Sequence, residues 1–261
     1  MRNLFLSIRC GRTFQKSISL RRSGNTTAAI DATAQPVSDK PVSSLPARLL
    51  SAVILAPVVL MIVHAGSPYF EVLTVVAGVV LAWEWLRMVM GNRGWPGWLF
   101  VGVIYIGIPC FSLVWLRADH EIGRITVFWV FALVWAADSG AYIFGRLIGG
   151  PKFAPRISPN KTWAGFLGGV FCAACVGLAA AVLLEKESLV VWGAVSAVLG
   201  AIAELGDLLE SKIKRYFDVK DTSKLIPGHG GLLDRVDGLL AASFATALID
   251  WGVEGSIIEW L

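Results

Sequence analysis

The segment from Glu204 to Asp237 concentrates the side chains that could do chemistry. It places carboxylates, lysines, arginines and His229 between two strongly apolar stretches. Carboxylate oxygens are preferred ligands of Mg²⁺, and Lys and Arg side chains bind phosphate oxygens. The mixture therefore indicates a site for an anionic ligand that arrives with a divalent cation. The alternative, a loop that only contacts lipid headgroups, would be expected to carry basic charge without the acids.

A glycine-rich turn, Pro227-Gly228-His229-Gly230-Gly231, lies within this segment. Glycine lets the backbone approach a ligand closely, and successive N–H groups then stabilise an anion. The run Asp234-Arg235-Val236-Asp237 follows it, and Asp207 and Glu210 lie upstream, one helical turn apart. Together these groups predict a site for phosphate and metal.

The elements that must position these residues are hydrophobic helices. The chain is 56% hydrophobic and 16% charged, whereas a soluble domain has about 25% charged and about 45–50% apolar residues. The apolar runs that could cross a bilayer as helices are Leu49–Ala65, Tyr69–Met90, Trp95–Leu116, Ile125–Phe144, Trp163–Leu184, Leu189–Ala203 and Gly238–Trp251. The last two are short, and the second and third are long enough to contain a break. We therefore expect an all-α polytopic membrane protein with about seven transmembrane helices, in a range of roughly six to nine.

The distribution of positive charge predicts the orientation, because cytoplasmic loops collect Lys and Arg. With the amino terminus inside, 20 of the 23 Lys and Arg residues fall on the inner side. The two long polar loops, Gly145–Thr162 and Glu204–Asp237, are then expected to be cytoplasmic and catalytic.

Residues 1–46 differ from the rest of the chain. They are rich in Ser, Thr, Arg and Ala and contain no long apolar run, which predicts a disordered, basic cytoplasmic arm ahead of a transmembrane catalytic domain at residues 47–261. Because the first 30 residues contain several arginines and no acid, an organelle transit peptide is the alternative.

Composition excludes several other classes of protein. The four cysteines are too scattered for a disulfide scaffold, and no group of Cys and His residues has zinc-ligand spacing. The net charge of +4 is modest and no basic stretch alternates with aromatic residues, so a nucleic-acid partner is not expected.

The residues of the charged segment resemble the signature of the phosphatidate cytidylyltransferases, also called CDP-diacylglycerol synthases. The resemblance rests on Ser211–Arg215, Lys220–Ser223 and Ile226–Asp237, and extends to Asp138–Tyr142, Ser158–Trp163 and Gly206–Ser211. It covers about Pro46 to Trp251 and leaves the arm outside.

The resemblance implies an enzyme that makes CDP-diacylglycerol and pyrophosphate from CTP and phosphatidate with Mg²⁺. It also implies a second, monovalent cation such as K⁺, a homodimer, and a bacterial inner-membrane location with the active site on the cytoplasmic face. A phosphate monoester has a second pKa of about 6, so the attacking lipid phosphate needs no strong general base.

Residue roles follow from this match. Asp207 and Asp234 are the first candidates for metal ligands, with Asp221 and Asp237 next, although each could instead pair with a neighbouring base. Catalytic roles fall on Asp207, Asp234, Lys161, Arg235 and His229. For His229 we expect a hydrogen bond to phosphate or to the transition state, and the alternative is a cap on its own glycine turn.

The expected substrate-binding residues are Asp138, Ser158, Asn160, Thr162, Lys214, Arg215, Lys220, Gly230 and Gly231. Asp138 lies inside an apolar run, where an ionisable side chain must face protein or a wet cavity. It could contact substrate, pair with Arg146, or bond a neighbouring helix. Glu84 and Arg87, three residues apart, are expected to neutralise one another.

Three rival functions make different demands. A CTP-dependent lipid kinase would transfer the γ-phosphoryl group instead. A transporter would place ionisable residues near the membrane midplane and show an internal repeat, neither of which is found. A CDP-alcohol phosphotransferase would need an Arg that the run after Asp237-Gly238 lacks.

Overall fold

The computed structural model describes residues 45–92, 94–226, 230–253 and 256–261, and side chains from residue 53 onward. All of these residues belong to one compact unit, Ser44–Leu261. The expected arm, apart from its last two residues, and His229 lie outside the described residues. Both therefore stay predictions.

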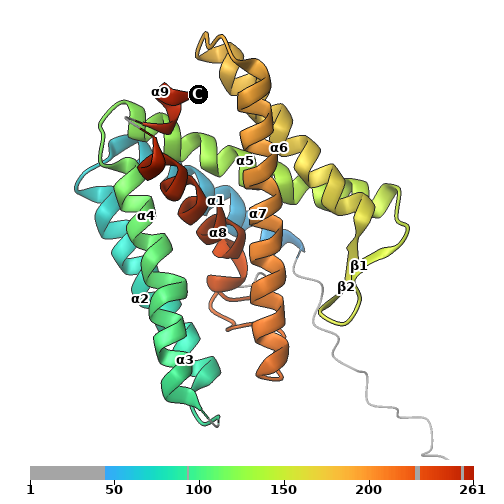
Figure 1. Cartoon of the computed structure of the whole chain (residues 1–261). Helices are drawn as coiled ribbons and strands as arrows, with labels where there is room; N and C mark the ends of the chain where they lie inside the picture. Colours follow the sequence, from blue (N-terminus) through green and yellow to red (C-terminus); the bar gives the residue numbers. More distant parts are fainter. Residues whose placement is uncertain (1–44, 93, 227–229, 254–255) are drawn as a thin grey trace, which may run out of the picture. The chain divides into compact units, whose positions relative to one another are not determined.

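The described chain is mostly helical (Figure 1). Its helices are α1 (Leu45–Ala65), α2 (Tyr69–Val89), α3 (Trp95–Gly102), η1 (Val103–Gly107), α4 (Ile108–Arg117), α5 (Ile122–Leu147), α6 (Trp163–Leu183), α7 (Leu189–Tyr216), α8 (Leu233–Gly252) and α9 (Ile257–Trp260). The short η1 segment is a π-helical turn that joins α3 to α4. The third apolar run was long enough to contain a break, but the helix continues through this turn as one stretch, Trp95–Arg117.

Five helical stretches within the described residues are long and apolar enough to cross a membrane: α2, the continuous α3–α4 stretch, α5, α6 and α7. This confirms the helical membrane class. The number seven stays a prediction. The described side chains of α1 cover only the shorter apolar stretch Val53–Ala65, and α8 contains Asp234, Arg235, Asp237 and Asp250.

The expectation that Glu204–Asp237 is one polar loop is wrong, because helices occupy both of its ends. Helix α7 continues to Tyr216 and α8 begins at Leu233. At 28 residues, α7 is about 42 Å long, whereas the hydrocarbon core is about 30 Å thick. Its polar end therefore extends beyond the apolar run, since apolarity marks where a helix meets lipid and not where the helix stops.

The loop expected at Gly145–Thr162 is also largely structured. Helix α5 extends to Leu147, and the antiparallel strands β1 (Lys152–Ala154) and β2 (Ser158–Thr162) form a hairpin after it. The Thr162 hydroxyl accepts a 3.1 Å hydrogen bond from the Gly165 N–H at the start of α6, which is the usual role of an N-cap threonine. This cap fixes β2 directly to the membrane helix that follows.

The hydrophobic core positions the polar ends of the helices. One cluster of buried residues joins α5, α6, α7 and α8 through Leu133, Ala173, Leu199 and Ala242. A second cluster joins α2, the π turn and the ends of α7 and α8, and it includes Trp85 and Phe217. The end of α7 and the start of α8 are thus held against several helices at once.

Candidate active site

Three carboxylates meet where α7 and α8 pack together. Asp207 and Glu210 lie one turn apart on α7, Asp237 lies on α8, and one oxygen from each is within 4.8 Å of the others. Two glycines allow this approach. A Cβ atom at Gly206 would lie 3.1 Å from the Asp237 carbonyl oxygen, and one at Gly238 would lie 3.2 Å from the Ala203 carbonyl oxygen.

Two lysines partly balance these carboxylates. The Lys161 ammonium, from β2, lies 2.8 Å from Asp207 Oδ2 and donates to the Glu204 carbonyl oxygen at 3.2 Å. The Lys214 ammonium forms ion pairs with Glu210, one turn earlier on α7, and with Asp234 Oδ1 at 2.9 Å. The hairpin, α7 and α8 are therefore connected through the site by charge-assisted hydrogen bonds.

Asp234 is held by the loop that precedes α8. Its carboxylate accepts hydrogen bonds from the N–H groups of Gly231 (2.9 Å) and Thr222 (3.1 Å), and from Lys214. Burial alone would raise the pKa of Asp234, but the hydrogen bonds from Lys214 and Gly231 outweigh burial and hold that pKa below its usual value. Asp234 therefore remains a carboxylate that fastens the loop to α7.

A polar cavity of about 660 Å³ lies beside these groups, and its size is typical of small-molecule sites. Its walls combine acids with bases and with donors from α5 and β2. They include Asp138, Tyr142, Arg146, Asn160, Lys161, Thr162, Glu204, Asp207, Lys214, Asp221, Asp234, Arg235 and Asp237. Tyr142 and Arg146 are hydrogen-bonded to each other at 2.7 Å on the α5 side.

Glu84, from α2, holds the other end of the same loop. It is completely buried, and its carboxylate accepts hydrogen bonds from the Ser223 and Thr222 hydroxyls and from the N–H groups of Leu232 and Leu233. The expected pairing with Arg87 is wrong. The Arg87 guanidinium instead lies 4.9 Å from the ring centre of Trp83, because the two side chains leave α2 toward different surroundings.

A model of the cytidylyltransferase family matches residues 94–250. This chain belongs to the cytidylyltransferase family. It is 44% identical over 173 residues to the phosphatidate cytidylyltransferase of Brucella suis biovar 1 (strain 1330), a match that covers 65% of this chain and 61% of that relative. It is 36% identical over 184 residues to the phosphatidate cytidylyltransferase of Staphylococcus aureus (strain COL), covering 68% and 69% respectively.

The match to the cytidylyltransferase family includes every residue named above as lining the polar cavity. It leaves out α2 and therefore Glu84. The aligned part of this chain spans less than two thirds of the Brucella relative.

In this member of the cytidylyltransferase family, most of the residues expected at the site lie together at the polar cavity. Five expected substrate contacts lie outside the wall of the polar cavity or have their backbone groups engaged. Ser158, Arg215 and Lys220 are not part of the wall of the polar cavity, and Arg215 donates to the Val219 carbonyl oxygen at 3.2 Å. The Gly230 N–H donates to Ile226 and the Gly231 N–H to Asp234, so both support the loop.

Glu210 was not expected as a metal ligand, although it meets Asp207 and Asp237. The spacing from Asp207 to Glu210 to Lys214, three and then four residues, was the signal, because it places all three on one face of a helix. Glu204, Tyr142 and Arg146 were also missed as wall residues. Tyr142 lies in an apolar run that was expected only as a membrane span, whereas Arg146 and Glu204 lie at the edges of the two expected catalytic loops.

The donor set fits a divalent cation that prefers oxygen ligands. Asp207, Glu210 and Asp237 can each present one oxygen to a shared point, and within the described chain Glu210 Oε1 is buried without a hydrogen-bond partner. Asp221 lines the cavity but is not part of this group, and Asp234 is engaged by Lys214 and the loop. A second, monovalent cation remains an expectation from the resemblance.

Proposed function

We propose that this protein transfers the cytidylyl group of CTP to phosphatidate, giving CDP-diacylglycerol and pyrophosphate. The observation that carries the proposal is the cluster of Asp207, Glu210 and Asp237, of which Asp207 and Asp237 line a cavity whose walls also supply Lys161 and Arg235. Carboxylates for a metal and cations for phosphate are the parts that phosphoryl-type transfer requires. The relatives named phosphatidate cytidylyltransferase supply the identity of the two substrates.

In this proposal Asp207, Glu210 and Asp237 hold Mg²⁺, and Asp234 orients the loop beside them. When bound, Mg²⁺ neutralises charge on the triphosphate and on the departing pyrophosphate. Lys161 lies beside Asp207 and is positioned to donate to a phosphate oxygen of CTP. Arg235, Arg146 and Asn160 offer further donors from other walls of the cavity.

The reaction proceeds by in-line displacement at the α-phosphorus of CTP. An oxygen of the lipid phosphate forms the new P–O bond, and the bond from the α-phosphorus to the bridging oxygen breaks, so that the electron pair leaves with pyrophosphate. The lipid phosphate, with a second pKa of about 6, is already largely ionised at neutral pH. The protein therefore positions the reactants and neutralises charge, and needs no base. His229, as a hydrogen-bond donor to phosphate, stays part of the proposal.

The proposal places the site at the cytoplasmic face of a bacterial inner membrane. CTP is a cytosolic solute, and the segments that supply the site are rich in Lys and Arg, as cytoplasmic loops are. The Arg215 guanidinium lies 3.5 Å from the Ile157 carbonyl oxygen. This contact supports placing the hairpin and the end of α7 on the same side of the membrane.

The decisive test is an assay of the purified protein with phosphatidate, Mg²⁺ and CTP labelled either in cytidine or in the γ-phosphate. Cytidine label in the lipid product, with release of one pyrophosphate for each lipid formed, would support the proposal. Transfer of γ-phosphate label to lipid without cytidine would identify a lipid kinase and overturn it.

A further inference from the structure

Tyr105 lies in the π-helical turn η1 between α3 and α4, and the mechanism proposed above does not use it. The turn has a cause in the sequence. In an α-helix the N–H of residue 109 would donate to the carbonyl oxygen of Tyr105, but Pro109 has no N–H. The α-helical pattern cannot continue past this carbonyl group, and the helix contains a π turn there. Such turns are frequent at functional sites.

The π turn places Tyr105 against the helices that carry the carboxylate cluster. Tyr105 packs on a buried cluster that contains Ile213 of α7 and Leu240 of α8. Ile213 follows Glu210 by three residues, and Leu240 follows Asp237 by three residues. Residues three apart share a helix face. Tyr105 therefore approaches α7 and α8 on the faces that present two of the three clustered carboxylates.

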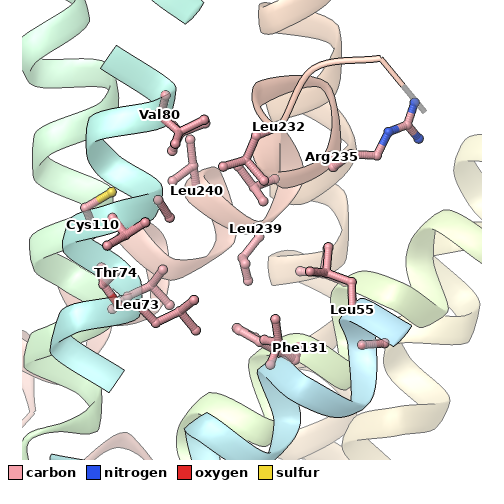
Figure 2. Close-up of a pocket in the computed structure, with 18 of the residues that line it drawn as sticks. Leu55, Leu73, Thr74, Val80, Cys110, Phe131, Leu232, Arg235, Leu239 and Leu240 are labelled. Carbon is pink, nitrogen blue, oxygen red and sulfur yellow. The ribbon is translucent and has the colours of Figure 1, made fainter. Parts of the chain in front are cut away.

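Several contacts fix the ring of Tyr105. It stacks on Trp85 of α2, with ring centres 5.5 Å apart and an angle of 30° between the ring planes. The Trp85 indole N–H donates to the Trp98 carbonyl oxygen at 2.9 Å. After the π turn, Cys110 of α4 packs on the same cluster, and Figure 2 shows Cys110 and Leu240 together in the wall of an apolar cavity of about 590 Å³. The ring is thus held by α2, α7 and α8.

The hydroxyl of Tyr105 lies near the carboxylate cluster. Asp237, Glu210 and Asp207 are close enough for their charges to act on it. Within the described chain the hydroxyl is buried and forms no hydrogen bond, and the same is true of Glu210 Oε1. A buried donor or acceptor without a partner is costly. Both groups therefore indicate that binding at this site completes their hydrogen bonds.

Glu210 is the acceptor that suits this hydroxyl best. Asp207 already pairs with Lys161 at 2.8 Å, and Asp237 accepts a 2.8 Å hydrogen bond from the N–H of the residue that follows it. A carboxylate has about four lone-pair sites. The Glu210 side chain can therefore serve a cation with one site and accept from a hydroxyl with another.

We propose that Tyr105 is a positioning residue of the metal site, whose hydroxyl donates a hydrogen bond to Glu210 when the divalent cation is bound. The inference rests on the proposed function and extends the metal site beyond its three carboxylates. Carboxylates that bind a metal are usually held by hydrogen bonds of their own, which orient them and strengthen binding. Tyr105 thus connects α3–α4 to the site, although it supplies no ligand itself.

The test compares Mg²⁺ binding by the full-length wild-type protein and by Tyr105→Phe, in detergent and without CTP or lipid. Binding is measured by isothermal titration calorimetry and by the rise in unfolding temperature on addition of Mg²⁺. The matched control is Tyr216→Phe. Tyr216 belongs to the same group of aromatic rings, with its ring centre 5.1 Å from that of Trp98, but it is 64% exposed and not part of the wall of the polar cavity.

Tyr105→Phe should weaken Mg²⁺ binding about 10–100-fold, the usual effect of removing a hydrogen bond to a metal ligand. Without Mg²⁺ it should unfold at the wild-type temperature or above, because the ring is kept and only a buried hydroxyl without a partner is removed. The rise in unfolding temperature with Mg²⁺ should be smaller than in the wild type. Tyr216→Phe should match the wild type in both measurements.

A purely structural role would give the opposite pattern. Unchanged Mg²⁺ affinity in Tyr105→Phe, whether or not the metal-free protein is less stable, would overturn the inference and leave the proposed function intact. Failure of the wild-type protein to bind Mg²⁺ would overturn the inference together with the metal site. Wild-type protein that binds Mg²⁺ but forms no cytidine-labelled lipid would contradict the proposed function alone.

Discussion

Glu84 and Ser223, which are 139 residues apart in the chain, are joined by a 2.5 Å hydrogen bond between Oε1 and Oγ. The same carboxylate accepts the N–H groups of Leu232 and Leu233 at 2.9 and 2.8 Å. Leu233 begins α8, so the negative charge also lies at the positive end of a helix dipole. One buried side chain of α2 thus fixes both the loop and the helix that presents Arg235 and Asp237.

The first prediction concerns this anchor. Glu84→Gln should lower the thermal stability and kcat, because an amide NH₂ would face donors and leave buried N–H or O–H groups unsatisfied, at a cost of about 1–3 kcal/mol each. The measurements are thermal unfolding in detergent and turnover. Arg87→Gln is the control, and we expect it to be close to wild type. An equal loss in Arg87→Gln would mean that Glu84 acts through Arg87 and not through the loop.

The second prediction concerns the metal. Asp207→Asn and Glu210→Gln should each lower kcat by about a hundredfold and raise the Mg²⁺ concentration needed for half-maximal activity. The control is Asp218→Asn, an exposed residue outside the polar cavity, which should keep wild-type turnover. Unchanged Mg²⁺ dependence in both site variants would remove this pair from the list of ligands.

The third prediction separates Asp234 from the metal ligands. Its contacts with Lys214, Thr222 and Gly231 indicate that Asp234→Asn should lower stability and kcat while the half-saturating Mg²⁺ concentration stays the same. Titration of activity with Mg²⁺ alongside Asp207→Asn makes the comparison. A parallel shift of Mg²⁺ affinity in both variants would restore Asp234 as a direct ligand, as its position in the sequence first suggested.

The fourth prediction concerns the sides of the membrane. In protein whose native cysteines are replaced by alanine, Arg156→Cys and Lys220→Cys should react with a membrane-impermeant thiol reagent only from the cytoplasm. His120→Cys should react only from outside. All three positions are exposed. Labelling of position 220 from outside would place the polar cavity away from cytosolic CTP.

Composition and hydropathy predicted the membrane helices well, because a helix in lipid must be apolar along its surface. The run Tyr69–Met90 and helix α2 differ by one residue. Neither the polar end of α7 nor the hairpin was predicted. Outside the hydrocarbon, hydropathy does not mark where a helix ends, and the spacing of charged residues is the remaining signal. Asp207 and Glu210 were placed one helical turn apart, but the rest of the segment up to Asp237 was interpreted as a loop.

The site was predicted in its chemistry and only partly in its geometry. Residue types and spacing pointed to Asp207 and Asp237, and the family resemblance pointed to Lys161; all three lie together at the polar cavity. The role of Glu84 had no local signal, because its partners are about 140 residues away. The hydrogen bond from the Gly231 N–H to Asp234 could not be predicted either. A glycine turn that binds an anionic ligand and one that binds a carboxylate of its own chain have the same sequence pattern.

Gly206 lies close to the backbone of α8, and Gly238 lies close to the backbone of α7. These two close approaches limit how the sequence of this protein can vary. The separation of Asp207 from Asp237 is determined by two positions that carry no functional group. A Cβ atom added at Gly206 would lie 2.5 Å from the Ala241 Cβ, so it would push α7 and α8 apart and widen the carboxylate cluster without altering any of its ligands. At Gly238 the closest contact would be 3.2 Å, which requires a much smaller shift. Tolerance to mutation in this protein should therefore follow helix spacing as closely as it follows chemistry, and an inventory of reactive side chains would overlook Gly206.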